Sequence, residues 1–171
     1  VTEIHVPSLF QVAFLGISTP KTITSSAPKY FQDENGNFIY GFCQDETGEA
    51  LYAAVQTAID AARGEGAQYV IGLAHLGNEA ECEPWTYADV IANTTGMDAL
   101  LDGHSHDTDQ VQMLNKDGET VLRSACGTKM EGIGYLTIST KGELATGVYM
   151  WPNKVAAPAL FGFDNEVAAA V

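Results

Sequence analysis

Residues 98–106 read Asp-Ala-Leu-Leu-Asp-Gly-His-Ser-His, and the interpretation of the fold starts from them. The short apolar run, broken by Gly103, predicts a buried strand that stops abruptly and leads into a loop. His104 and His106 lie on that loop, one residue apart. Ligands of open α/β sheets collect beyond the carboxyl ends of the strands, so the two imidazoles are candidates for chemistry, although a histidine pair at a strand end can also be a solvated loop.

A second apolar run is also followed by a histidine at its carboxyl end. Residues 69–74 read Tyr-Val-Ile-Gly-Leu-Ala, and His75 follows directly. If the two strands are parallel neighbours, His75 lies beside His104, which is the arrangement that a multi-histidine metal site needs. We therefore predict that His75, His104 and His106 converge as metal ligands, with satisfied or solvent-exposed histidines as the alternative.

The residues around these histidines resemble the calcineurin-like metallophosphoesterases, and within them the 5'-nucleotidase and UDP-sugar hydrolase family. The resemblance rests on Ala-His-Leu-Gly at residues 74–77, on Trp85, on residues 87–94 and 98–106, and on flanking segments at residues 12–20 and 127–138. It implies an α/β fold that is part of a four-layer αββα sandwich with a mixed β-sheet. It also implies two divalent metal ions, such as zinc, manganese or cobalt, with His75 and His104 on one ion and His106 on the other.

The upstream motifs of that family are missing from this chain. They are Asp-x-His, then Gly-Asp-x-x-Asp, then Gly-Asn-His followed by Glu or Asp, and none of them occurs here. In the family they carry the bridging aspartate, the remaining metal ligands and the histidine at the leaving group. The resemblance therefore implies that residues 1–151 are the C-terminal half of a metallophosphoesterase domain from a longer parent protein. Residues 152–171 are then a linker or terminal helix toward a following domain.

The resemblance also implies a function for the parent protein, namely hydrolysis of phosphoesters in nucleotides or nucleotide sugars. It places the parent outside the cytoplasm, as a periplasmic, cell-surface or secreted protein. The chain alone is expected to be inactive, because no bridging carboxylate holds both ions and no catalytic residue beyond the metal ligands is assigned to it. Self-association is expected through sheet surface that the missing half would cover. The alternatives are a non-catalytic histidine metal-binding module, a protein-interaction module, and a related cyclic-nucleotide phosphodiesterase or thiosulfohydrolase.

Composition limits the classes of partner. The chain has 171 residues, of which 46% are hydrophobic, as expected of one globular domain. Its formal net charge of −14 argues against binding of a nucleic-acid polymer or an anionic membrane through the general surface. No apolar stretch is long enough to span a bilayer. Cys43, Cys82 and Cys126 lack Cys-x-x-Cys spacing, which predicts isolated thiols rather than a thiolate zinc site, with one disulfide left open.

The remaining pattern predicts helices covering a sheet. A long helix is expected from an N-cap at Thr47 to Gly64, with a shorter one over residues 85–92. Further strands are expected at residues 11–16, with a weak edge strand over residues 1–10. Antiparallel hairpins are expected from strands at residues 110–114, 120–124, 133–140 and 144–151.

Two loops between these elements contain polar and aromatic side chains. Residues 21–44 are predicted to form a long loop or small hairpin whose aromatic side chains pack onto the domain, with a base or sugar pocket as the alternative. Glu79, Glu81 and Glu83 lie in the second loop. They are predicted to be solvated charges, with metal ligation as the alternative.

Overall fold

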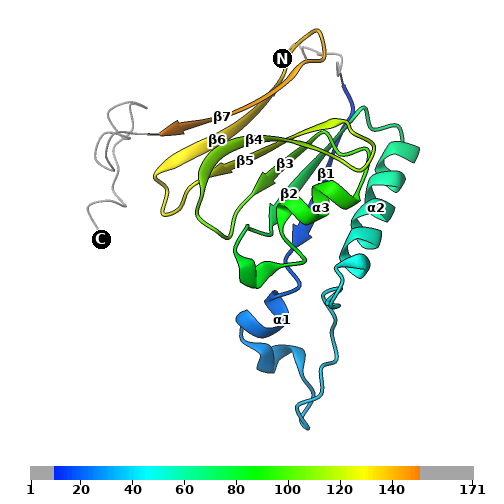
Figure 1. Cartoon of the computed structure of the whole chain (residues 1–171), viewed down its shortest axis with the longest axis vertical. Coiled ribbons are helices and arrows are strands. Elements are labelled where there is room, and N and C mark those ends of the chain that lie inside the picture. Colours follow the sequence, from blue (N-terminus) through cyan, green and yellow to red (C-terminus); the bar gives the residue numbers. More distant parts are fainter. Residues whose placement is uncertain (1–9, 151–171) are drawn as a thin grey trace, which may run out of the picture.

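The computed structural model describes residues 10–150 (Figure 1). The weak edge strand expected over residues 1–10 and the linker or helix expected over residues 152–171 fall almost wholly outside the described residues. No helix in the described part of the chain is both long enough and apolar enough to cross a membrane.

A five-stranded mixed sheet forms the centre of the protein (Figure 1). Its strands, in spatial order, are β1 (Val12–Ser18), β2 (Tyr69–His75), β3 (Ala99–Asp102), β5 (Thr120–Cys126) and β4 (Thr108–Leu114). The first four are parallel, and β4 pairs with β5 antiparallel at one edge. The near-continuous apolar runs of β2 and β3 are typical of central strands of a parallel sheet. The sequence prediction of an α/β fold with a mixed sheet is confirmed.

Two helices cover one face of this sheet. Helix α2 (Glu49–Gly64) places Leu51, Val55 and Ile59 in the core, together with residues of β1 and β2. Helix α3 (Tyr87–Asn93) starts two residues later than predicted, after a reciprocal capping box formed by Thr86 and Asp89.

The start of α2 differs from the prediction that Thr47 is its N-cap. The N-cap residue is Gly48, which has a left-handed φ of 79° and no side chain that could cap the helix. The Asp45 carboxylate instead accepts hydrogen bonds from the N–H groups of Gly48 and Ala50. The Thr47 hydroxyl still accepts from the Glu49 N–H at 3.4 Å, but the main cap is the Asp45 carboxylate, which is favourable at the positive end of a helix.

A two-stranded hairpin forms a second β layer. Strands β6 (Gly132–Ile138) and β7 (Leu144–Met150) pair antiparallel, and the hairpin lies over β4 and β5 (Figure 1). Both predicted antiparallel hairpins are therefore present. Strand β5 also pairs with β3, which joins the β4–β5 hairpin to the parallel sheet.

The segment between β1 and α2 extends away from the sheet (Figure 1). It contains α1 (Thr22–Ser25), the 3-10 helix η1 (Pro28–Phe31) and a single bridge between Gln32 and Phe38. The prediction that its aromatic side chains pack onto the domain is wrong for Tyr30, Phe38 and Tyr40, which are 70%, 48% and 60% exposed. Local turns supply hydrogen bonds to the backbone of this segment, so the segment can extend away from the core and leave these side chains exposed.

Candidate metal centre

Three strands end at one edge of the sheet, and the loops that follow them lie side by side. The Thr19 N–H donates to the His75 carbonyl at 3.1 Å, and the Gly103 N–H donates to the Ala74 carbonyl at 3.1 Å. These bonds tie the end of β1 to β2 and the loop after β3 to β2. The rings of His75 and His104 meet edge to face, with centroids 5.0 Å apart and an interplanar angle of 84°. The parallel pairing of β2 and β3 thus places the two histidines together.

The third predicted ligand, His106, follows two residues after His104 and is exposed. His75 is also exposed, whereas the His104 side chain is 21% exposed. His104 and His106 have φ values of 82° and 58°, in the left-handed region that few non-glycine residues adopt. Such residues persist only where the surrounding structure holds them. Metal ligation by His75, His104 and His106 stays a prediction.

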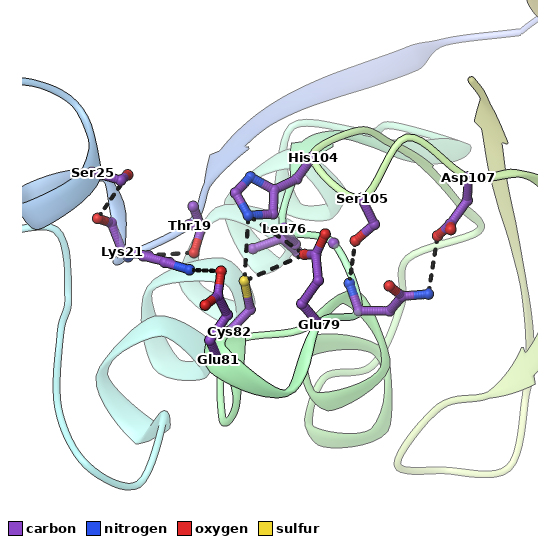
Figure 2. A network of polar contacts seen from close by, with 12 residues as sticks. Thr19, Lys21, Ser25, Leu76, Glu79, Glu81, Cys82, His104, Ser105 and Asp107 are labelled. Carbon is purple, nitrogen blue, oxygen red and sulfur yellow. Dashed lines mark hydrogen bonds and ion pairs between the residues drawn. The ribbon is translucent and has the colours of Figure 1, made fainter. Parts of the chain in front are cut away.

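Hydrogen bonds lock the loop after β2 to the loop after β3. The buried Asp102 carboxylate accepts from the N–H groups of Leu76 at 2.9 Å and Gly77 at 3.1 Å. The Ser105 hydroxyl accepts from the Asn78 N–H at 2.7 Å, and the Asn78 side chain donates to Asp107 at 3.0 Å (Figure 2). The histidines are therefore carried by one cross-linked unit rather than by two independent loops.

A buried arginine supports this unit from β5. The Arg123 side chain is fully buried and pairs with Asp102 and Asp107, each at 3.2 Å, and with Asp109. Its guanidinium also lies 4.0 Å from the centroid of the Tyr87 ring. Asp102 is thus engaged by Arg123 and by two backbone N–H groups, and is not free to bridge metal ions. Sequence reasoning missed Arg123, although an arginine within an apolar strand was a signal that it needed buried partners.

The structure brings together a different set of metal-binding side chains, Glu79, Cys82 and His104 (Figure 2). Cys82 Sγ lies 3.4 Å from His104 Nε2 and 3.7 Å from Glu79 Oε2, and His104 Nε2 lies 3.5 Å from Glu79 Oε2. Cys82 ends the 3-10 helix η2 (Ala80–Cys82) and is fully buried. Within the residues that the structure describes, Cys43, Cys82 and Cys126 are all free thiols.

The electrostatics of this group differ between its members. Burial raises the pKa of the Cys82 thiol, and the charge of Lys21 only partly opposes that effect. Burial also acts to raise the pKa of Glu79, but hydrogen bonds, chiefly from Ser105, and the charge of His104 outweigh it and lower the pKa. Lys21 is paired with Glu81, and this hydrogen bond raises the pKa of Lys21 (Figure 2). At neutral pH the group therefore combines an ionised carboxylate with a protonated thiol.

A cavity of about 260 Å³ lies elsewhere, between β1 and α2. Its walls are mainly apolar and include Leu15, Phe42, Leu51 and Val55, and none of the three predicted histidines lines it. Its lining offers no cluster of charged groups, so the chemistry of this protein is better sought at the sheet edge than in this cavity.

Comparison with known proteins shows which solved structures have a similar fold. No protein-family model and no curated protein matches the sequence. Among solved structures, a 5'-nucleotidase precursor from Thermus thermophilus superposes with a TM-score of 0.57 at 20% identity, over 92% of this chain and 32% of that one. A calcineurin-like phosphoesterase from Bacillus subtilis superposes with a TM-score of 0.51 at 19% identity, over 81% of this chain and 44% of that one.

These superpositions define the class of fold, and they confirm the fold that the resemblance in sequence implied. The chain has the α/β fold of part of a calcineurin-like phosphoesterase. It spans about a third of the length of the Thermus thermophilus protein and less than half of the Bacillus subtilis protein.

Proposed function

We propose that this chain is the C-terminal half of a metal-dependent phosphoester hydrolase domain whose parent acts on nucleotides or nucleotide sugars. The observation that carries the proposal is the meeting of His75 and His104 at the carboxyl edge of the parallel sheet. The likeness of the fold to a 5'-nucleotidase and a calcineurin-like phosphoesterase supports the reaction class. Residues 1–151 form the half-domain in this proposal, and residues 152–171 lead toward a following domain.

In this proposal His75 and His104 would hold one divalent ion and His106 the other. Such ions would supply Lewis acidity toward a phosphoryl oxygen and activation of a water molecule. The chain's own residues hold the histidine side chains in position. Asp102 and Ser105 fix the two histidine loops to each other through backbone N–H groups, which limits the drift of the imidazoles.

Asp102, the buried carboxylate nearest in sequence to the histidines, is not free to bridge two ions, because Arg123 and two backbone N–H groups occupy it. Misplacement of a reacting group by about 1 Å can cost on the order of a hundredfold in rate. The chain alone therefore gives no substantial turnover, and the rest of the metal shell comes from upstream residues of the parent.

The sheet face away from α2 supports the half-domain proposal. Phe14 and Leu73 lie in adjacent strands on that face and are 61% and 46% exposed. Apolar side chains on a sheet face are usually covered by another layer. Self-association of the isolated chain through this face stays a prediction, as does the location of the parent outside the cytoplasm.

The test is phosphate release from nucleoside monophosphates and nucleotide sugars with added manganese, zinc or cobalt. The parent is expected to release phosphate, its His75→Ala variant to lose on the order of a hundredfold in rate, and the isolated chain to release almost none. A parent that releases no phosphate from any substrate of the panel contradicts the proposed reaction. Robust release by the isolated chain, abolished by His104→Ala, contradicts the half-site.

A further inference from the structure

We propose that Glu79, Cys82 and His104 bind a zinc ion through a carboxylate oxygen, a thiolate sulfur and the imidazole Nε2. This site shares His104 with the proposed phosphoesterase centre but does not rest on it, because Glu79 and Cys82 have no role in that function. The group draws its ligands from two loops, with Glu79 and Cys82 following β2 and His104 following β3.

The distances within the group agree with a tetrahedral ion. Zinc bonds of about 2.3 Å to sulfur and about 2.1 Å to nitrogen or oxygen, at tetrahedral angles, separate sulfur from nitrogen or oxygen by about 3.6 Å and nitrogen from oxygen by about 3.4 Å. The structure has 3.4 Å for sulfur to nitrogen, 3.7 Å for sulfur to oxygen and 3.5 Å for nitrogen to oxygen. Each agrees to within about 0.2 Å, so the ligands can hold zinc with little movement.

The three contacts also fit a hydrogen-bonded group without an ion, in which the Cys82 thiol donates to Glu79 and its sulfur accepts from the His104 Nε2–H. Cys82 is fully buried, so its partners must be found within the protein. A single ion bonded to all three atoms satisfies the sulfur, the nitrogen and the oxygen together.

The charges balance when zinc binds. The Cys82 thiol loses its proton to solvent, the sulfur–zinc bond forms, and the thiolate and the Glu79 carboxylate together offset the two positive charges of the ion. The neighbouring Lys21 is already paired with Glu81 (Figure 2). A thiolate in the ligand set favours zinc over magnesium, calcium and manganese, and three protein ligands leave a fourth position for water.

The loop that carries Glu79 closes around the group only because residue 77 has no side chain. A Cβ at Gly77 would lie 2.5 Å from the Ser105 hydroxyl, 2.8 Å from His104 Cδ2 and 2.9 Å from Glu79 Oε2. Gly77 also has a φ of 73°, which favours glycine. The ligands are thus preorganised by a close approach of the two loops.

Cobalt substitution tests the sulfur ligand in the 171-residue chain. Addition of Co²⁺ under reducing conditions should give a sulfur-to-cobalt charge-transfer band in the near ultraviolet, and an excess of Zn²⁺ should abolish it. The band should be lost in Cys82→Ser and kept in the matched control Cys126→Ser and in His75→Ala. No band in the wild-type chain, or a band that persists in Cys82→Ser, overturns the proposal.

Two further measurements keep the test decisive if Cys82→Ser folds poorly, as judged by circular dichroism. Zinc-edge X-ray absorption of the wild-type chain should show one sulfur at about 2.3 Å, and a shell of nitrogen and oxygen alone overturns the proposal. Glu79→Gln should keep the cobalt band but weaken zinc binding at least tenfold, and unchanged affinity removes Glu79 from the site. Because His75→Ala affects phosphate release by the parent and not the cobalt band, failure of the zinc site and failure of the proposed function are distinguishable.

Discussion

Replacing Arg123 with methionine should strongly destabilise the protein, because it leaves a buried charge without its partner. The Arg123 and Asp102 side chains are both 0% exposed. Breaking such a pair by removing one member costs about 3–5 kcal/mol. Asp107 and Asp109 are 26% and 43% exposed, so solvent screens them and the loss of each pairing adds only about 0–1 kcal/mol. Most of the decrease in the free energy of unfolding should therefore come from the broken pair with Asp102.

Urea and thermal unfolding followed by circular dichroism measure this loss. A change of about 3–5 kcal/mol corresponds to a fall in Tm of roughly 6–20 °C for a chain of this size. The matched control Lys141→Met, at an exposed position, should stay within about 0.5 kcal/mol of the wild type. In an Asp102→Asn background the further cost of Arg123→Met should shrink, because no buried negative charge is left. An Arg123→Met protein within about 1 kcal/mol of the wild type would refute the reasoning.

Three further substitutions test separate parts of the structure. Gly77→Ala should lower zinc affinity in a competition titration by about tenfold or more, because the added Cβ would lie 2.8 Å from the His104 ring. Unchanged affinity would contradict the close approach of the loops that follow β2 and β3. Hydrogen bonds, chiefly from the Ala50 N–H, lower the pKa of Asp45 from 3.8. The stabilisation of α2 by this carboxylate is therefore fully present above pH 3.8 and is lost as the pH falls through the folded-state pKa. Asp45→Asn should therefore flatten the acid limb of stability measured by urea unfolding between about pH 5 and 2, whereas an unchanged acid limb would remove Asp45 as the cap. Ile59→Ala, at a residue 1% exposed, should cost about 2–5 kcal/mol in the same assay, and a near-neutral result would place α2 off the core.

The sheet was predictable because its central strands carry continuous apolar runs. Residues 69–74 are followed by His75 and residues 99–102 by Gly103, so the pattern indicated both the presence of β2 and β3 and the edge at which they end. Parallel pairing of neighbouring strands then brought His75 and His104 together, which needed no knowledge of loop conformation.

The Glu79, Cys82 and His104 group was not predictable in the same way. Spacing motifs detect ligands that are close in sequence, whereas His104 lies 22 residues after Cys82. The group depends on the path of the loop after β2, which Asp102 and Ser105 fix through backbone N–H groups. These contacts between loops distant in sequence leave no periodic pattern.

The Arg123 network and the start of α2 were missed for related reasons. Arg123 finds Asp102 on the adjacent strand β3, Asp107 just before β4 and Asp109 within β4, and strand propensity says nothing of such partners. The cap of α2 comes from Asp45 because the chain turns through a left-handed Gly48, and a local rule that looks only at the residues next to the helix selects Thr47.

Anomalous diffraction from crystals of the parent protein grown with manganese tests the central claim most directly. Manganese prefers oxygen ligands, such as the carboxylates expected from the upstream part of the parent, and avoids the thiolate that favours zinc, so it separates the phosphoesterase centre from the Cys82 site. The proposed function predicts an anomalous peak directly coordinated by His75 and His104, with a second ion at His106. A fully occupied manganese site that includes neither His75 nor His104 would contradict it.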